Sequence, residues 1–157
     1  MPFTLFHGML SATAAALFTR DWRLIAIAFL GGCIPDLDGV PILFDLNLYR
    51  QLHHVLLHPP IYGMVFGAIV AFALWKLYLM DWKLVLAAFF AGYALHSITD
   101  LFFTDWPIRM LWPLSEQQFS YPVLMQYNIP FALAVGLAFG IMALSFYPKK
   151  KKMPILH

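Results

Sequence analysis

The stretch KLVLAAFFAGYALHSITDLFF, residues 83–103, decides the fold class of this chain. A helix needs about 20 predominantly apolar residues to cross a bilayer, and this stretch supplies them. It also carries His96 and Asp100, and an ionisable side chain at membrane depth costs roughly 2.5 to 3.5 kcal/mol on insertion scales. We therefore expect a membrane-spanning helix whose two ionisable side chains have a partner or a task.

The composition of the whole chain is that of a membrane protein. Of its 157 residues, 62% are hydrophobic and 11% are charged, and the mean hydropathy is +0.74. A soluble domain of this length could not bury so much apolar surface. The net charge is +2, and no basic stripe with interleaved aromatic residues is present, so we expect a membrane partner and no nucleic acid. The sequence indicates no particular oligomeric state.

Five apolar runs predict an all-α helical bundle of about five spans that forms one domain over residues 1–157. The runs cover residues 3–19, 22–34, 59–80, 83–103 and 129–147. The opening residues lack a basic start, so we expect the first run to be a retained span and not a cleaved signal peptide. The second run is short, because its helix rises only about 20 Å against a hydrocarbon core of roughly 30 Å. We therefore expect its end, Pro35–Asp38, to lie below the membrane surface.

The basic residues predict an orientation. If the tail Lys149–Lys152 is cytoplasmic, five crossings place Arg20, Arg23, Lys76 and Lys83 on the same side. The same threading places further ionisable residues on or near the opposite face, namely His7, Asp36, Asp38, Asp45, His53, His54, His58, His96, Asp100, Asp105 and Glu116. This predicts a multi-pass protein of a plasma membrane or bacterial inner membrane, with a cytoplasmic C-terminus and its polar site toward the outside.

Residues 21–32 and 81–92 resemble each other at an offset of 60 residues. Both begin with Asp-Trp and a basic residue, continue as an apolar run and end in glycine, and Asp36 then falls opposite His96. This predicts a parallel repeat of two-span units, with both halves contributing to one site. The alternative is that apolar helices share a small alphabet.

The ionisable residues form a pattern typical of metal ligands. His96 and Asp100 lie four apart in a helical run and so share one face. Asp36 and Asp38 lie where the short second helix breaks, and two carboxylates there can point toward a cation or bridge two cations. We expect His54 and His58 to be one helical turn apart if residues 47–58 are helical, with His53 turned away. The candidate metal ligands are therefore His7, Asp36, Asp38, His54, His58, His96 and Asp100.

Each of these residues also has a structural interpretation. His7 could be an interhelical hydrogen-bond partner, His96 and Asp100 could bond each other, and Asp36 and Asp38 could cap a helix and close a turn. Four separate segments would then need separate structural reasons on the same side. A metal site therefore explains the pattern better.

A divalent cation in such a site predicts hydrolytic chemistry. Zinc is favoured if histidines dominate, and the carboxylates leave manganese, magnesium or iron open. The cation makes water nucleophilic near neutral pH and polarises a carbonyl or phosphoryl oxygen. A spare carboxylate, Asp38 or Asp100, would move the proton, and Arg50 could bind an anionic phosphate. We expect a lipid or lipid-linked ester, above all a phosphoester, as the substrate.

The chain resembles a family of membrane-bound metal-dependent hydrolases, also described as LexA-binding, inner-membrane-associated hydrolases. The matching motifs are His7-Gly8, Gly-Gly-x-x-Pro-Asp-Leu-Asp at residues 31–38, Arg-x-x-x-His at residues 50–54, Gly-Tyr-x-x-His-x-x-x-Asp at residues 92–100 and Leu-Trp-Pro-Leu-Ser at residues 111–115. The resemblance implies metal or catalytic roles for His7, Asp36, Asp38, His54, His96 and Asp100. A fainter similarity to zinc phospholipase C and P1 nuclease favours phosphoester hydrolysis.

One departure from the family pattern concerns the ligand set. The family commonly reads His-Arg-x-x-x-His-Ser, whereas this chain has Tyr49 before Arg50 and Val55 after His54. We therefore expect His53 or His58 to supply the missing ligand. No residue here supports the LexA contact in the family's description. The remaining alternatives are a divalent-cation transporter or channel, because intramembrane His and Asp also line ion pathways, and a non-enzymatic membrane scaffold.

Overall fold

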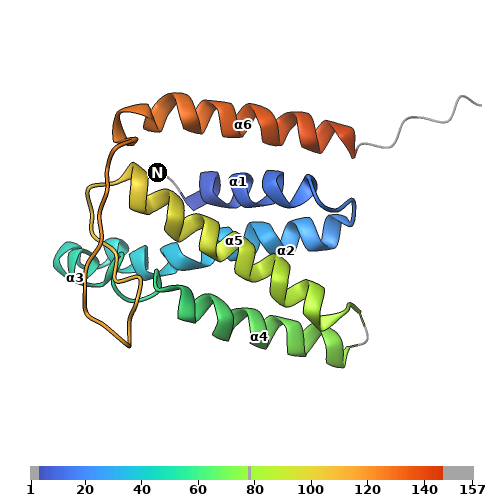
Figure 1. Ribbon diagram of the computed structural model, residues 1–157, viewed down its shortest axis with the longest axis horizontal. Helices are drawn as coiled ribbons and strands as arrows, with labels where there is room; N and C mark the ends of the chain where they lie inside the picture. The colour runs from blue at the N-terminus through green and yellow to red at the C-terminus, as the bar shows by residue number, and fades with distance from the viewer. Residues whose placement is uncertain (1–3, 78, 147–157) are drawn as a thin grey trace, which may run out of the picture.

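The computed structural model describes residues 4–77 and 79–146, and in that part of the chain it is all-helical (Figure 1). Its α-helices are α1 (Thr4–Ala16), α2 (Trp22–Cys33), α3 (Leu46–Leu52), α4 (Pro60–Lys76), α5 (Trp82–Phe103) and α6 (Asn128–Ser145), and its 3-10 helices are η1 (Ile34–Leu43) and η2 (Met125–Tyr127). The only β-type pairing among these residues is one isolated bridge between Ile108 and Phe119. The predicted all-α class is confirmed.

Three helical stretches are long and apolar enough to cross a membrane: Trp22–Leu43, Trp82–Phe103 and Met125–Ser145. The apolar helix α4 is shorter, and α1 has 13 residues. The structure therefore supports a membrane bundle, while the number five stays a prediction. The second span differs from expectation, because α2 does not simply stop at its end but continues directly into η1.

Helices α2 and α5 begin with the same type of N-cap. The side chains of Asp21 and Asp81 accept hydrogen bonds from the backbone N–H groups of Arg23 and Lys83, and so cap the two helices. Capping by Asp satisfies an N–H group that has no partner inside the helix. The matched Asp-Trp-basic starts therefore have a local cause, and the internal repeat remains a prediction.

Small residues let α1, α2 and α5 approach one another closely. A Cβ atom on Gly31 would collide with the carbonyl of Phe89, and one on Gly92 would collide with the carbonyl of Ala28. The Ser11 hydroxyl donates to the Gly92 carbonyl over 3.2 Å and so ties α1 to the same crossing. Glycine and serine at helix crossings are typical of membrane bundles, where close backbone approach drives association.

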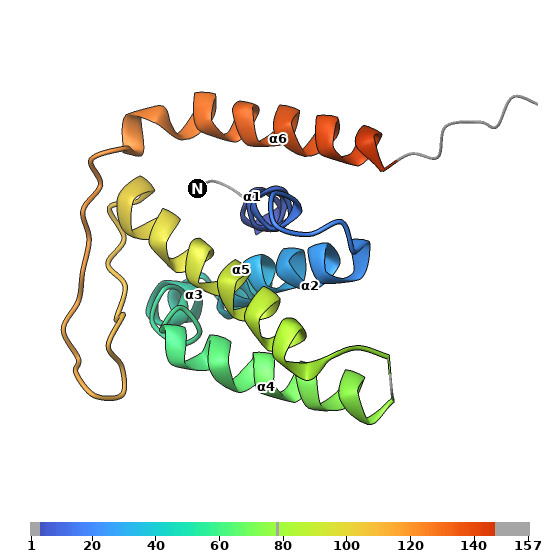
Figure 2. The same cartoon turned by 45° about the vertical axis from the view of Figure 1, so that its right-hand side comes forward.

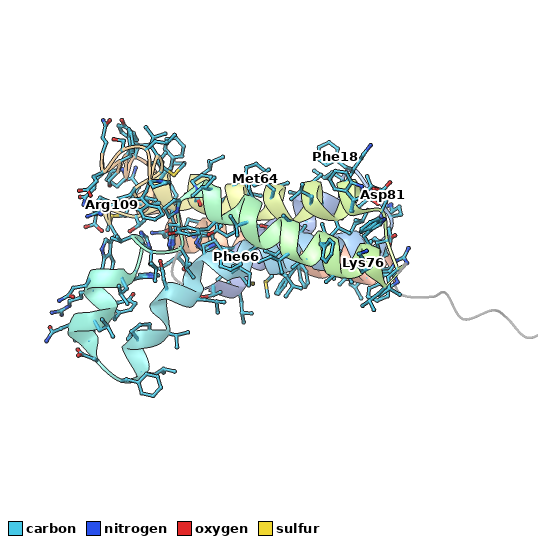
Figure 3. The ribbon with its side chains drawn as sticks, turned by 90° about the horizontal axis from the view of Figure 1, so that it is seen from below. Phe18, Met64, Phe66, Lys76, Asp81 and Arg109 are labelled. Carbon is cyan, nitrogen blue, oxygen red and sulfur yellow. The ribbon has the colours of Figure 1, made fainter. Side chains whose placement is uncertain are left out.

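The interior of the bundle is apolar over much of its length and polar at one end. The buried hydrophobic cluster consists of Leu24, Ile27, Ala71, Val85, Phe89 and Tyr93. Figure 1 shows that α1 and α4 begin, and α5 ends, at the end where α3 lies. Lys76 and Asp81 lie at the opposite end, whereas Arg109 lies on the α3 side (Figure 3). Buried ionisable residues on α1, η1 and α5 are therefore brought to the same end.

Candidate metal centre

Four chain segments supply the polar cluster: the first half of α1, η1, the loop between α3 and α4, and the second half of α5. Figure 2 shows that the segment joining α5 to α6 also lies at this end. The side chains of His7, Asp38, His54, His58, His96 and Asp100 are all buried. The structure thus brings together all seven residues predicted as metal ligands, with Asp36 slightly more exposed.

Asp36, His58, His96 and Asp100 offer four ligand atoms that all lie within 4.8 Å of one another. The Nε2 atoms of His58 and His96 are 3.2 Å apart. Asp100 Oδ2 lies 3.4 Å from His58 Nε2 and 3.2 Å from His96 Nε2. Asp36 Oδ1 lies 3.8 Å and 3.5 Å from the same two nitrogens. Four potential ligands therefore surround one point.

The other ring nitrogens of both histidines are already used as donors. His58 Nδ1 is 3.0 Å from the carboxylate of Asp38, and His96 Nδ1 is 2.7 Å from the carbonyl of Gly32. Since a carboxylate and a carbonyl can only accept, both Nδ1 atoms carry the proton, and neutral rings present a lone pair at Nε2. Two lone pairs and two carboxylates then converge, and this arrangement requires a positive charge between them.

His58 lies in the loop outside the spans, and its pKa also indicates that a positive charge is favoured here. Burial by itself lowers the pKa of His58, but the hydrogen bonds and charges of Asp100 and Asp38 outweigh it and raise the pKa to about 9. The surroundings of this ring therefore favour a positive charge. A metal ion bound here would supply that charge in place of the proton, and its binding would release the proton.

The distances between the four atoms fit a divalent metal ion. A tetrahedral zinc site with bonds of about 2.0 to 2.1 Å has ligand atoms about 3.3 Å apart. The five separations given above run from 3.2 to 3.8 Å. A backbone carbonyl or carboxylate on the second nitrogen of each ligating histidine is also the usual arrangement at metal sites. The residues present thus fit a metal ion.

Asp38 occupies a different place from the one predicted. Its Oδ2 accepts from His58 Nδ1 and from the Leu57 N–H, and its Oδ1 lies 2.8 Å from His53 Nδ1. Its side chain is fully buried and stands behind His58 as seen from the four converging atoms. The geometry makes Asp38 a residue that orients and polarises His58, whereas Asp36 faces the centre directly.

The condition set for His54 and His58 to lie one helical turn apart is not met, because α3 ends at Leu52 and residues 47–58 do not form one helix. His53 is the extended C-cap residue of α3, and His54 has a φ of 68°, in the left-handed region that non-glycine residues rarely adopt. His53 therefore does not turn away but bonds Asp38. Strained backbone of this kind persists only where the surroundings impose it, and it gathers at functional sites.

His54 lies beside the four-ligand group without joining it. Its Nε2 is 3.6 Å from Asp100 Oδ2, and its buried Nδ1 has no hydrogen-bond partner. Its ring stacks on that of His58 at a centroid distance of 4.3 Å, and His53, His54 and His58 form a second group whose potential ligand atoms lie within 4.8 Å of one another. Burial, and then the charge of His58, lower the pKa of His54 to about 3, which keeps it neutral.

Two side chains of α5 hold the loop in this conformation. The Ser97 hydroxyl donates to the His58 carbonyl over 2.8 Å, and the Tyr93 hydroxyl donates to the Leu57 carbonyl. Sequence reasoning missed both residues. The loop itself had one sequence signal: Pro59 follows His58, and a residue before proline is disfavoured in a helix.

His7 reaches the cluster from α1. Its Nε2 lies 3.1 Å from Asp100 Oδ1, its Nδ1 lies 3.1 Å from the Thr99 hydroxyl, and its ring stacks on His96 at a centroid distance of 3.8 Å. Thr99 is a third residue that sequence reasoning missed. It lies next to Asp100 on α5, and a buried hydroxyl at this depth needs a partner.

A cavity of about 600 Å³ opens beside the cluster. Its lining includes the polar residues Asp36, His53 and His54 and the apolar residues Val40, Ile42, Leu43 and Trp106. Arg50, predicted to bind a phosphate, is exposed on α3 and does not line this cavity. Tyr49, which stands where the family has histidine, stacks on His53 at a centroid distance of 4.8 Å. Of His53 and His58, the two residues expected to replace the missing ligand, only His58 belongs to the four-residue group.

Comparison with known proteins identifies the family. Residues 3–156 match the YdjM inner membrane protein family, so the chain belongs to that family. No curated protein and no solved structure matches the chain significantly. Together with the three long apolar helices, the family assignment establishes a membrane protein.

Proposed function

We propose that this member of the YdjM inner membrane protein family is a metal-dependent hydrolase of a lipid or lipid-linked ester, above all a phosphoester. One observation carries the proposal: two imidazole lone pairs and two carboxylates converge beside a cavity whose wall is half apolar. A divalent ion bound there supplies nucleophilic water near neutral pH and polarises the oxygen of an ester. Zinc is the first candidate, with manganese, magnesium and iron as alternatives.

The other roles in the proposed reaction fall to side chains around the centre. Asp36, His58, His96 and Asp100 hold the ion, and Asp38 fixes the His58 ring through Nδ1. His53 lines the cavity and is held through Nδ1 by Asp38, and this position makes it the candidate general base. The aliphatic side chains of Val40, Ile42 and Leu43 provide a surface for an acyl or isoprenoid chain.

The proposed topology has five crossings, a cytoplasmic C-terminus and the metal centre at the outer leaflet. Lys76 lies at the end of the bundle opposite the centre (Figure 3), and Arg20, Arg23 and Lys83 lie close to the turns that precede α2 and α5. Basic residues concentrate on the cytoplasmic side of membrane proteins. The Lys149–Lys152 tail falls outside the described residues. Fusions of a reporter enzyme that is active only outside the cytoplasm, placed after residues 79 and 120, test the orientation. Only the fusion after residue 120 should be active.

The decisive experiment combines metal analysis with turnover. Detergent-purified wild type should carry metal near or above one equivalent and release the headgroup of a phospholipid in mixed micelles. The double variant His96→Ala/Asp100→Ala should lose both the metal and the turnover, while the exposed Asp105→Ala variant should keep both. Bound metal without hydrolysis of any phospholipid or lipid-linked phosphoester would overturn the enzymatic proposal.

The cavity also predicts how a substrate arrives. Because its apolar wall is built from η1, which continues the span that begins at α2, a lipid can enter sideways from the bilayer. Equal turnover of a water-soluble phosphodiester and of phospholipids would contradict this lateral route. A divalent-cation transporter needs polar groups across the full depth of the membrane, but the buried cluster around Leu24, Val85 and Phe89 is apolar. Metal uptake into sealed proteoliposomes that disappears in His96→Ala would favour transport instead.

A further inference from the structure

An apolar groove lies between α4 and α5, toward the end of the bundle where Lys76 and Asp81 lie and away from the metal centre (Figure 3). Its volume is about 260 Å³, and its lining consists of Ala68, Ala71, Phe72, Trp75, Trp82 and Leu86. The four lining residues of α4 recur at helical spacing and share one face, and the two of α5 are one turn apart. The groove therefore follows the helix pair toward the turn that joins α4 to α5.

The groove opens where the close contact between the two helices ends. A Cβ atom on Gly67 would press on the side chains of Leu86 and Phe89, so the backbone of α4 lies tightly against α5 at that level. One turn later the large side chains of Trp75 and Trp82 are exposed. Space lined only by apolar side chains does not hold water, and the bilayer around it offers acyl chains. An acyl chain is therefore the natural content of this groove.

Two lysines lie beside the groove, one from each helix that forms it. The ammonium nitrogen of Lys76 is 4.8 Å from the ring centroid of Trp75 and 5.6 Å from that of Phe72. The ammonium nitrogen of Lys83 is 5.8 Å from the ring centroid of Trp82. All three rings line the groove, and an ammonium group is attracted to the face of an aromatic ring. These contacts keep two positive charges next to the groove.

The other basic side chains near this end already have partners within the chain. Arg23 is paired with Asp21 over 2.8 Å, and the guanidinium of Arg20 lies over the ring of Phe146 at 5.6 Å. Neither of the two lysines forms an ion pair with a carboxylate in the part of the chain that the structure describes. Their charges are therefore available to an anion from outside the protein.

We propose that the groove binds an anionic phospholipid, with part of one acyl chain between α4 and α5 and the phosphate at Lys76 and Lys83. The volume of the groove is below the roughly 300 to 1,000 Å³ of pockets that enclose a whole small ligand, so it suits a segment of one chain. Tryptophan belongs at the level of the headgroups, and basic pockets between membrane helices attract anionic ones. This lipid site lies away from the metal centre and does not depend on the proposed hydrolase activity.

Lipid titration of the full-length protein tests the charge part of the proposal. Detergent-purified protein is titrated with phosphatidylglycerol or with phosphatidylcholine of the same chains, and bound lipid is counted by native mass spectrometry. The wild type should prefer phosphatidylglycerol. Lys76→Gln/Lys83→Gln should bind it about 30 times more weakly, about fivefold for each lysine, whereas Arg20→Gln should bind it normally. Equal binding of the two lipids by the wild type, or unchanged binding by the double lysine variant, would overturn the site.

A second pair of variants tests the groove itself. Ala68 is exposed and lines the groove, so Ala68→Phe should fill it and weaken phosphatidylglycerol binding about tenfold, the equivalent of about two buried methylene groups. Ala73 is also exposed on α4 but lies outside the groove, and Ala73→Phe should bind like the wild type. Equal affinities in the two variants would contradict a chain in the groove. A dimer that Ala68→Phe dissociates while the double lysine variant leaves it intact would show that a second copy occupies the groove and would refute the lipid.

Discussion

Replacing Asp38 with asparagine separates a residue that orients a ligand from a residue that binds metal. The Asn oxygen can take the place of Oδ2 and accept from His58 Nδ1 and the Leu57 N–H, while its NH₂ group faces His53. The geometry is retained and the negative charge behind His58 is lost. Loss of such an outer partner typically weakens metal binding about 10- to 100-fold, which corresponds to about 1.4 to 2.7 kcal/mol.

The assay is competition for Zn²⁺ against a chelator of known affinity, with the wild type, Asp38→Asn and Asp36→Asn. We expect Asp36→Asn to bind far more weakly than Asp38→Asn, because its carboxylate faces the other ligand atoms directly. Asp105→Asn, at an exposed position, makes the same chemical change away from the centre and should bind like the wild type. If Asp38→Asn loses metal as completely as Asp36→Asn, or loses none, the arrangement inferred for His58 is wrong.

Three further predictions concern the packing around the centre. Ser97→Ala leaves the His58 carbonyl without its donor and should destabilise the protein by about 1 to 3 kcal/mol, seen as a lower melting temperature in detergent, whereas Ser97→Thr should recover part of the loss. Gly92→Ala drives a methyl group into the Ala28 carbonyl and should cost about 1 to 3 kcal/mol, while Gly140→Ala, where nothing lies within 4 Å of the new methyl group, should be neutral or stabilising; equal melting temperatures would contradict the close crossing. Chelator should lower the melting temperature of the wild type, because an ion at 100 times its Kd contributes about 2.7 kcal/mol, and an unchanged melting temperature would argue against a bound ion.

The parts of the site that follow helical periodicity were predictable. His96 and Asp100 share a face because they are four residues apart in a long apolar helix, and both project into the cluster. The convergence of residues from distant segments also followed, because ionisable groups in an apolar chain must gather away from lipid.

The loop between α3 and α4 could not be predicted from local sequence. Hydrogen bonds from Tyr93 and Ser97, which lie about 40 residues further along the chain, fix the carbonyls of Leu57 and His58, and His54 in the same loop has a positive φ. The different roles of Asp36 and Asp38 were equally hidden, because they depend on η1 being a 3-10 helix in which the two side chains diverge. Arg50 matched the sequence motif, but the end of α3 leaves it outside the cavity.

The ligands of the centre are widely separated along the chain, and this has a consequence for biosynthesis. The four-residue group runs from Asp36 to Asp100, and His7, which contacts Asp100, lies on α1. Since chains are made and inserted from the N-terminus, the early segments enter the membrane before α5 is present to contact their polar groups. A nascent chain arrested before His96 therefore holds at most half of the ligand set. The four-residue group is therefore complete only once the second half of α5 has been made.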